Sequence, residues 1–377
     1  MIETILAITA GTAAIFLIGV LVHRKVRQWR IARALRIRSA HGIAEERFVR
    51  IGGIDQWIGI RGEDRDNPVL LVIHGGPGSS YGIFTPVIRS WEKHFTVVQW
   101  DQRGAGRTLG RTGRDRTGKL TFDGVIQDGI EVAEFVHRRL HKSKVILLAS
   151  SLGSLIGLAM VKRRPDLFCA YVGTDQNVGI ARGREAAHHA TLDRLRRAGL
   201  TKGVAALERI GSDPSGWSAK DFTTTAQWTM RSDPRTSNQI MNLLRSAIWF
   251  FPGFTLRDIK NFVSGMEFST AQLLKEMSTY DAWQQGIHFE VPFFILQGEN
   301  DVLTPPNLAE EFFTDVVAPL KDMAVIRDAG HFAAFMQPEQ FLNELLIRVR
   351  PLATAPESAG EHAQPLPRIP ARRHSLS

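Results

Sequence analysis

Short runs of apolar residues alternate with amphipathic stretches through the middle of the chain. The apolar runs are rich in Val, Ile, Leu and aromatic residues and occupy 69–74, 95–101, 144–150, 167–174, 291–298 and 322–328. Continuous apolar runs of this length predict strands that are buried on both faces, and their alternation with helices predicts a mostly parallel sheet. A stretch around Gly52 and Gly53 has two β-like halves, which predicts an opening hairpin.

A long gap separates the fourth of these runs from the fifth. Residues 176–290 hold no convincing buried strand but several helical patterns, such as "TSNQIMNLLRSAIW". We therefore expect an α/β core built from 45–175 and 291–350, with 176–290 as a helical insertion over the sheet. From Pro351 onward the chain contains five prolines and almost no periodicity, so we expect 351–377 to be a disordered tail.

The N-terminus carries the longest uncharged segment. Residues 5–22 are eighteen residues without a charge, which is just enough helix to cross a bilayer, and the segment His23 to Arg38 follows with seven Lys or Arg and no acid. A cleaved signal peptide would normally begin with cations, whereas here only Glu3 and the terminal amine precede the apolar run. We expect an anchor over 1–22, a basic juxtamembrane segment over 23–44 lying on anionic headgroups, and a cytoplasmic catalytic domain.

The overall charge changes little beyond that segment. The chain has 377 residues and a formal charge of +9, and subtracting the seven cations of the juxtamembrane segment leaves +2 for the remainder. The basicity is therefore local, and we expect no nucleic-acid partner. The single cysteine, Cys169, excludes an intramolecular disulfide and lies in an apolar run typical of a buried thiol.

The residues that follow each predicted strand are the candidates for chemistry, because catalytic groups gather at the carboxyl ends of parallel strands. Three serines, Ser150, Ser151 and Ser154, lie at the end of the run 144–150. A sharp strand-to-helix turn that presents a nucleophile needs small residues two before and two after it. Only Ser151 meets this condition, with Ala149 and Gly153 in those positions.

Other strand ends supply the remaining parts of a serine hydrolase. Asp301 follows the run 291–298 and His331 follows the run 322–328, so the chain order is Ser151, Asp301, His331. This is the order of the α/β-hydrolase arrangement. Glu299, two residues from Asp301, is an alternative acid.

A glycine-rich turn, "HGGPG", follows the run 69–74. Such a turn supplies one main-chain N–H to an oxyanion hole, and the residue after the nucleophile supplies the other. This assigns the two donors to Gly76 and Leu152. With His331 as the base for Ser151, the set predicts cleavage of an ester or amide through an acyl-enzyme. A serine nucleophile excludes the dehalogenases and epoxide hydrolases of this fold, which attack with aspartate.

These motifs together carry a family resemblance. "HGGPGSS", "WDQRGAGRT", the turn around Ser151, "GEND" and "AGHF" resemble the proline iminopeptidase branch of the α/β-hydrolases over most of residues 45–350. The resemblance implies an α/β-hydrolase fold with a helical cap, the same Ser-Asp-His triad, no metal, and acidic residues of the cap and nearby loops that bind the substrate's free amine. Glu185 is the candidate for that role, and a solvated helical glutamate is the alternative.

Two motifs depart from the family pattern. The family tends to have G-G-S-W-G around the nucleophile and G-R-Y-D around the acid, where this chain has Ala149-Ser150-Ser151-Leu152-Gly153 and Gly298-Glu299-Asn300-Asp301. Both departures lie near the substrate pocket, so they affect the proline preference and leave the hydrolase assignment in place. The cap tryptophans at 217, 228 and 249 either line a pocket or pack the cap on the core.

Three functions remain open at this point. The first is a membrane-anchored serine hydrolase of the iminopeptidase type that acts on short peptides, amides or esters. The second is a carboxylesterase, or a lactone or thioester hydrolase, for a hydrophobic metabolite. The third is a silent binding protein on the same fold. The pairs His137/His141 and His188/His189 lack an HExxH motif or a convergent carboxylate, so we expect neither a metal nor another cofactor.

Overall fold

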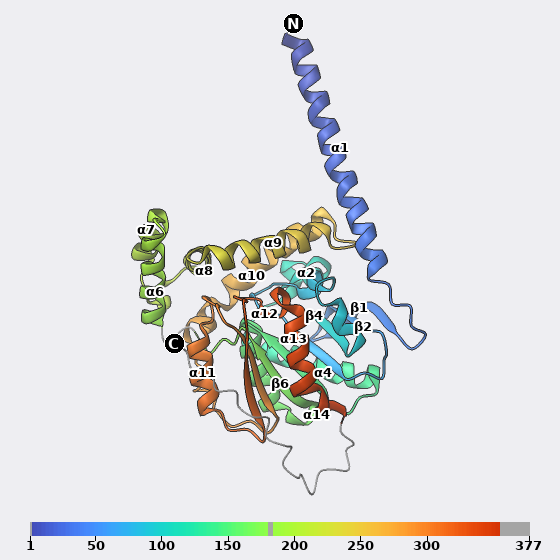
Figure 1. Ribbon diagram of the computed structural model, residues 1–377, viewed down its shortest axis with the longest axis vertical. Coiled ribbons are helices and arrows are strands. Elements are labelled where there is room, and N and C mark those ends of the chain that lie inside the picture. Colours follow the sequence, from blue (N-terminus) through green and yellow to red (C-terminus); the bar gives the residue numbers. More distant parts are fainter. Residues whose placement is uncertain (1, 180–183, 355–377) are drawn as a thin grey trace.

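The computed structural model describes residues 2–179 and 184–354 (Figure 1). The expected disordered tail lies outside the described residues from 355 onward, and its first residues, up to Thr354, are helical. Eight strands form one sheet in the order β1-β2-β4-β3-β5-β6-β7-β8. The strands are β1 Ile43–Ile51, β2 Ile54–Gly62, β3 Val69–Ile73, β4 Thr96–Asp101, β5 Val145–Ser150, β6 Phe168–Thr174, β7 Phe293–Gly298 and β8 Lys321–Ile326.

The sheet is parallel from β4 to β8, and β1 and β2 add an antiparallel edge. β1 and β2 form the predicted hairpin, in which Gly52 and Gly53 make the turn at φ of 53° and 78°. These backbone angles favour glycine over residues with a Cβ. Each of the six apolar runs seen in the sequence overlaps one strand of the sheet, so the predicted α/β fold with a mostly parallel sheet is confirmed.

Helices cover both faces of the sheet. Along β3, Leu70 and Val72 belong to one buried cluster, whereas Leu71 and Ile73 belong to the other, because successive strand residues point to opposite faces. The helices of the core are α2 Gly106–Thr112, α3 Arg114–Thr117, α4 Phe122–Leu140, α5 Leu152–Arg163, α11 Pro306–Asp315, α12 Ala333–Met336, α13 Pro338–Glu344 and α14 Arg350–Thr354, with 3₁₀ turns η1 Tyr81–Phe84, η2 Arg89–Lys93 and η3 Pro165–Leu167 and a π-helix η5 Leu345–Val349.

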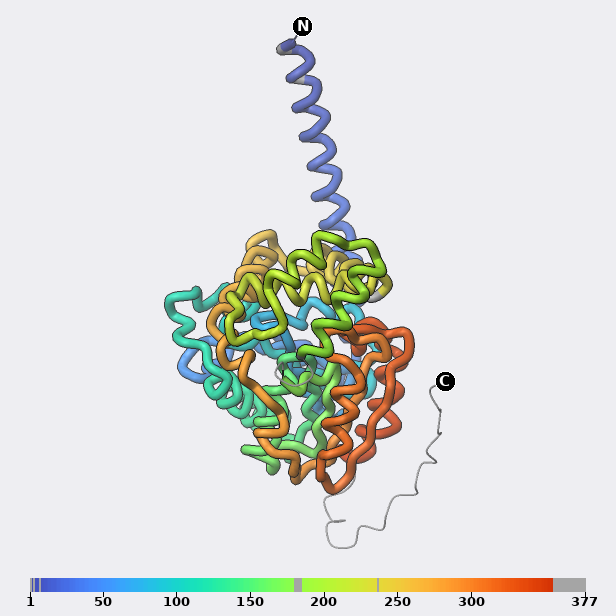
Figure 2. Tube along the Cα trace, turned by 90° about the vertical axis from the view of Figure 1, so that its left-hand side faces the viewer, coloured from blue at the N-terminus to red at the C-terminus, as the bar shows by residue number. Residues whose placement is uncertain are grey.

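The segment between β6 and β7 is helical. It contains α6 Arg184–Arg197, α7 Thr201–Ile210, α8 Ala219–Arg231, α9 Pro234–Phe250 and α10 Leu256–Thr279, with a 3₁₀ turn η4 Pro214–Gly216. The hydroxyl of Ser269 in α10 donates to the carbonyl of Gly104, 3.1 Å away, and a Cβ on Gly78 would lie 2.3 Å from the carbonyl oxygen of Gly265. α10 therefore lies directly on the loops that follow β3 and β4, so these helices cap the carboxyl edge of the sheet (Figure 2).

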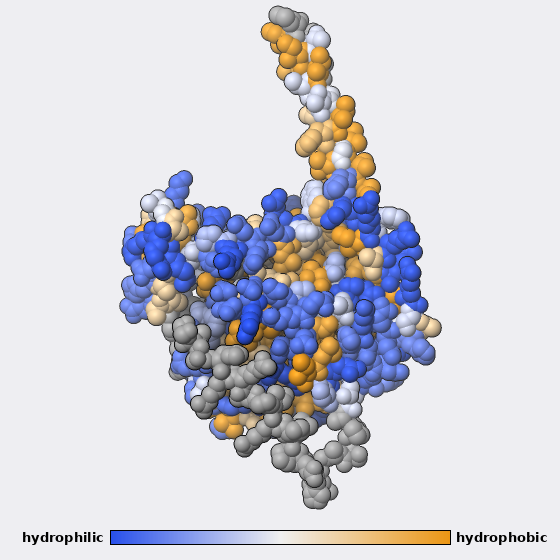
Figure 3. Space-filling model, in the orientation of Figure 1, coloured by the Kyte–Doolittle hydropathy of each residue, from blue (hydrophilic) through white to orange (hydrophobic). Residues whose placement is uncertain are grey.

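One helix, α1 Ile2–Ala34, projects from the body and points away from the sheet on the side of the cap (Figures 1 and 2). Its apolar window is not buried in the structure, and the helix is long and apolar enough to cross a membrane. Figure 3 shows apolar side chains along its exposed length, in contrast with the mainly polar surface of the body in that view.

The basic stretch departs from the expected surface helix. It continues α1 without a break to Ala34, and two of its side chains, Arg24 and Gln28, are buried at 4% and 5% exposure. Both donate hydrogen bonds to carbonyl groups of the last turn of α9 and of the α9–α10 connection. The sequence did not reveal this contact because the acceptors are main-chain atoms more than 220 residues away along the chain.

Candidate active site

Ser151 occupies the sharp turn between β5 and α5. Its backbone has φ 54° and ψ −126°, a conformation that a residue with a Cβ rarely adopts. The turn brings α5 so close to β3 that a Cβ on Gly153 would lie 2.5 Å from the carbonyl oxygen of His74. Glycine is therefore required at position 153, two residues after the serine, as the sequence pattern predicts.

Ala149 stands where the family usually has glycine, and the structure shows what accommodates its methyl group. A Cβ added to Gly157, one turn further along α5, would lie 2.7 Å from the Cβ of Ala149. Gly157 has no side chain, so the helix leaves room for the Ala149 methyl group in the strand. The departure in sequence leaves the strand–helix contact intact.

The structure brings Ser151, Asp301 and His331 together. His331 Nε2 lies 3.1 Å from Ser151 Oγ, and His331 Nδ1 lies 2.9 Å from Asp301 Oδ2. In the neutral imidazole, Nδ1–H donates to the carboxylate, so that Nε2 accepts the proton of the serine hydroxyl. A hydroxyl linked in this way to an imidazole and a carboxylate can lose its proton as it attacks a carbonyl carbon.

Hydrogen bonds fix the Asp301 carboxylate for this contact. Its Oδ1 accepts from the N–H groups of Leu303 and Thr304, each at 2.9 Å, and its Oδ2 accepts from the Thr304 hydroxyl at 2.6 Å. The alternative acid Glu299 lies elsewhere: its carboxylate is exposed and accepts from the N–H of Asp328 at 3.0 Å. The contact with His331 is therefore made by Asp301.

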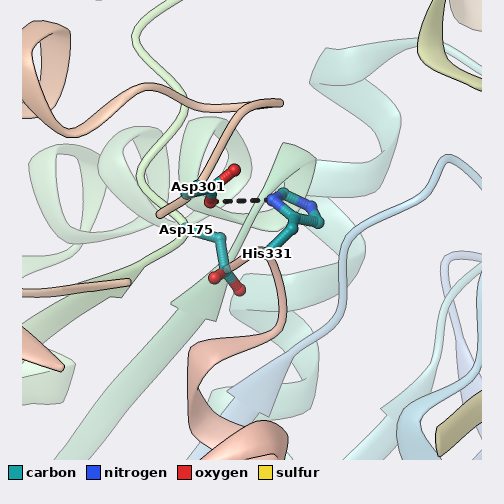
Figure 4. Close-up of side chains that lie close together, drawn as sticks. All are labelled: Asp175, Asp301 and His331. Carbon is teal, nitrogen blue, oxygen red and sulfur yellow. Dashed lines mark hydrogen bonds and ion pairs between the residues drawn. The ribbon is translucent and has the colours of Figure 1, made fainter. Parts of the chain in front are cut away.

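A second carboxylate, Asp175, lies beside the first and is absent from the sequence-based set (Figure 4). It directly follows β6, is fully buried, and comes within 4.8 Å of both the Asp301 and His331 donor atoms. Its Oδ2 accepts from the Ser150 hydroxyl at 2.8 Å and its Oδ1 from the Ala333 N–H at 3.1 Å. The position after a predicted strand, which singled out Asp301, also fits Asp175 and could have found it.

The two carboxylates govern the charge of the imidazole. Burial alone would lower the pKa of His331, but the charges of Asp301 and Asp175 together raise it to about 9. Burial raises the pKa of Asp175 to about 6; the charge of His331 opposes this rise and that of Asp301 adds to it. The site therefore favours the imidazolium, the form that His331 takes once it has accepted a proton.

The same three residues offer donor atoms close enough for a metal ion. Each of those atoms already has a partner, however, since His331 Nδ1 bonds Asp301 and the Asp175 oxygens bond Ser150 and Ala333. A metal would have to displace a hydrogen bond of His331, either that of Nδ1 with Asp301 or that of Nε2 with Ser151. The donor set therefore suits proton transfer better than metal binding.

The glycine-rich turn after β3 lies against the serine. A Cβ on Gly75 would lie 2.7 Å from the Cβ of Ser151, and Gly76 has φ 123°. Among residues 2–179 and 184–354, no hydrogen bond occupies the main-chain N–H of Gly76 or of Leu152. Both candidate oxyanion donors are therefore available beside Ser151.

His74 ties this turn to the neighbouring one. Its Nδ1–H donates to the carbonyl of Gly75 at 2.8 Å, and its Nε2 accepts from the N–H of Gln102 at 3.1 Å. The Gln102 side chain in turn donates to the His74 carbonyl at 2.8 Å. Because burial lowers the pKa of His74, the ring is held in the neutral form that this pair of bonds requires.

The other candidates from the sequence lie outside this cluster. Glu185 is in the first turn of α6 with a side chain 83% exposed, and its carboxylate lies 3.9 Å from His189 Nε2. Trp228 packs against α7, where a Cβ on Gly203 would touch its ring, and Trp249 stacks with Arg24 of α1. The structure therefore supports the surface alternative for Glu185 and the packing alternative for these two tryptophans.

Comparison with known proteins agrees with the fold and the motifs. The model of the alpha/beta hydrolase fold family matches residues 68–338. "Probable aminopeptidase YbaC" of Bacillus subtilis is 27% identical over 312 residues, which cover 82% of this chain and 97% of that protein. Proline iminopeptidase of Thermoplasma volcanium is 32% identical over 116 residues, or 30% of this chain and 37% of that protein.

Among solved structures, proline iminopeptidase of Mycobacterium smegmatis has a TM-score of 0.56 and 17% identity, covering 82% of this chain and 99% of that one. This likeness concerns the fold. The match of the family model spans most of the chain, including Ser151, Asp301 and His331. The protein is a member of the alpha/beta hydrolase fold family, with relatives named as aminopeptidases and proline iminopeptidases.

Proposed function

We propose that the protein is a membrane-anchored serine hydrolase that cleaves short peptides, amides or esters through an acyl-enzyme. Ser151 is the nucleophile, His331 the general base and then the general acid, and Asp301 the carboxylate that orients the imidazole. The main-chain N–H groups of Gly76 and Leu152 stabilise the oxyanion. The observation that carries the proposal is the 3.1 Å approach of His331 Nε2 to Ser151 Oγ.

The chemistry balances within these groups. Ser151 Oγ forms a bond to the carbonyl carbon while its proton passes to His331 Nε2, and the same proton then goes to the leaving nitrogen or oxygen. Water repeats the sequence on the acyl-enzyme and regenerates Ser151. The charges of Asp301 and Asp175 favour the imidazolium that exists between the two proton transfers.

We also propose that the exposed part of α1 crosses a membrane and that the catalytic domain lies on the cytoplasmic side. The length and apolarity of α1 support the first part, and the cluster of cations directly after the apolar run supports the second.

The relatives' names favour an aminopeptidase-type activity. A second candidate, hydrolysis of an ester, lactone or thioester of a hydrophobic metabolite, is favoured by the place of Glu185. Because that carboxylate is exposed on α6, it does not provide the cluster with an anion for a substrate's free amine. The observation weakens the case for an N-terminal peptide without affecting the acyl-transfer machinery.

A fluorophosphonate probe tests the serine chemistry. The folded protein should be labelled on Ser151, and Ser151→Ala should abolish labelling, whereas Ser154→Ala should retain it. If the folded protein is not labelled, the enzyme proposal is wrong and the protein is a silent binding protein on this fold.

A comparison of substrates then separates the two candidates. An aminopeptidase should turn over proline arylamide. Turnover of p-nitrophenyl esters, together with no turnover of any free-amine substrate, would reject the aminopeptidase hypothesis in favour of the esterase hypothesis.

A further inference from the structure

Residues 23–28 of α1 bind the end of α9 and the α9–α10 connection, and we call this contact the junction. Arg24 donates from Nε to the carbonyl of Trp249 at 2.9 Å and from Nη2 to the carbonyl of Phe254 at 2.6 Å. Gln28, one turn later, donates to the carbonyls of Phe251 and Phe254 at 2.9 and 3.1 Å. These carbonyls end α9 and precede α10, so the two side chains satisfy acceptors that the helix end leaves free.

Aromatic contacts reinforce the junction. The Arg24 guanidinium lies 4.9 Å from the ring centre of Trp249, and the Arg27 guanidinium 5.2 Å from that of Phe250. The His23 ring packs edge-on against Phe250 at 5.8 Å. Since α1 is one continuous helix, these contacts set its direction relative to the whole catalytic domain.

The segment that α1 holds also packs on the loops around the active site. Phe251 and Phe254 belong to the same buried cluster as Tyr81 and Phe335. The Tyr81 hydroxyl bonds Ser150, next to the nucleophile, and Phe335 lies in α12, which begins two residues after His331. The projecting helix therefore contacts the segment between α9 and α10, and this segment in turn packs against residues next to Ser151 and His331.

The face of the cap beside α1 suits a lipid surface. Met241, Arg245 and Trp249 recur every four residues along α9, and the last of them touches α1. Leu256, at the start of α10, is 58% exposed, and Arg257 is next to it. We call these five residues the anchor-side face. Its two arginines form no ion pair within the described parts of the chain, so they are available to anionic headgroups.

We infer that α1 holds the catalytic domain with the anchor-side face against the bilayer, and that the enzyme takes its substrate from the membrane: an amphipathic ester or thioester whose acyl chain lies in the lipid. This inference rests on the proposed function. α1 lies on the same side of the molecule as α9, which carries three of the five residues of the anchor-side face, so a helix that crosses the bilayer brings the cap to its surface (Figure 1). The amino ends of the parallel strands then face away from the lipid.

Fluorescence quenching tests the orientation in full-length protein in vesicles of phosphatidylcholine with a minority of phosphatidylglycerol. In a Cys169→Ala background, Leu256→Cys and Ser143→Cys each carry an environment-sensitive dye. Ser143 is exposed and precedes β5 at the far edge of the sheet. A lipid-borne quencher should quench the dye at 256 several-fold more than the dye at 143. Equal quenching at the two positions overturns the inference.

Two double variants test the role of the junction. Arg24→Ala/Gln28→Ala removes the hydrogen bonds to the cap, whereas Lys25→Ala/Arg30→Ala removes two exposed cations of the same helix. The first should lower turnover of vesicle-borne p-nitrophenyl palmitate about five-fold or more and leave that of water-soluble p-nitrophenyl butyrate within about two-fold, because the carbonyl contacts and not the net charge set the orientation. The second should leave both rates within about two-fold.

If Arg24→Ala/Gln28→Ala lowers both rates equally, or neither, the inference is wrong. Labelling of Ser151 by the fluorophosphonate probe is measured on every variant. If the unmodified protein is not labelled, the proposed function is wrong. If it is labelled but quenching at 256 and 143 is equal, only the membrane orientation is wrong.

Discussion

Two carboxylates face one imidazole in this site, and they hold it differently. Asp301 bonds His331 directly, while Asp175 bonds Ser150 and Ala333 and acts on the ring through its charge. A buried negative charge beside the base raises its pKa and so moves the pH at which the base becomes available. Substitutions can therefore distinguish the effect of Asp175 on His331 from that of Asp301.

Asp175→Asn should shift the pH dependence of hydrolysis. Removing one of the two charges lowers the pKa of His331, so the ascending limb of kcat/KM, which follows loss of the His331 proton, should move to lower pH by about one unit. The asparagine retains an acceptor for Ala333 N–H. Asp328→Asn, a change at an exposed carboxylate, should leave the limb in place. A limb that stays or moves upward after Asp175→Asn contradicts this account.

Asp301→Asn should affect the rate rather than the pH limb alone. An asparagine donates to His331 Nδ1 and stabilises the wrong tautomer, so kcat should fall about 10³- to 10⁴-fold. Glu299→Gln is the matched control, because its carboxylate contacts Asp328 and not His331; its kcat should stay within about two-fold. Similar losses in the two variants would show that Asp301 is not the orienting acid.

In the contact between β5 and α5, the methyl group of Ala149 lies against a glycine, Gly157. A Cβ on Gly157 would lie 2.7 Å from that of Ala149 and 3.1 Å from Tyr171. Overpacking of a rigid strand–helix contact costs about 1–3 kcal/mol. Gly157→Ala should therefore lower the free energy of unfolding by that amount in urea denaturation.

The paired change makes this a test of the contact itself. Ala149→Gly/Gly157→Ala should be more stable than the sum of the single changes predicts, with a coupling of about 1 kcal/mol, because the methyl group has moved from strand to helix. Gly216→Ala has open space around it and should change stability by less than about 0.5 kcal/mol. Strict additivity would show that the two positions do not compete for the same space.

The sequence predicted the strands and the hairpin but not the contacts between distant segments. Buried strands are visible as unbroken apolar runs, and Gly52–Gly53 marks the hairpin turn. Asp175 follows the run 167–174 just as Asp301 follows 291–298, so the same rule would have identified it. What joins Asp175 to His331 is the neighbouring position of β6, β7 and β8, which only the sheet order reveals.

The two parts of α1 have different surroundings, and we expect them to have different roles. Its apolar part is exposed, whereas residues 23–28 bind the cap through Arg24 and Gln28, which are buried. Cations after an apolar run are commonly read as headgroup contacts, and sequence alone does not show that one of them binds main-chain carbonyls more than 220 residues away.

Two truncations should separate these roles. Removal of residues 1–22 should release the protein from the membrane fraction and leave Tm unchanged. Removal of residues 1–34 should also lower Tm by roughly 3–6 °C, since the hydrogen bonds of Arg24 and Gln28 are lost. Thermal unfolding followed by circular dichroism gives both values. Equal Tm for the two truncated proteins would mean that the junction adds no stability.

The two hydrogen bonds between His74 and Gln102 make the link between their turns redundant. The Gln102 main-chain N–H donates to the His74 ring, and the Gln102 side chain donates to the His74 main-chain carbonyl, so each bond pairs a side chain with a main-chain group. A substitution at either position therefore removes one bond and leaves the other in place. Because both residues are buried, the main-chain group that loses its partner would still carry a desolvation cost.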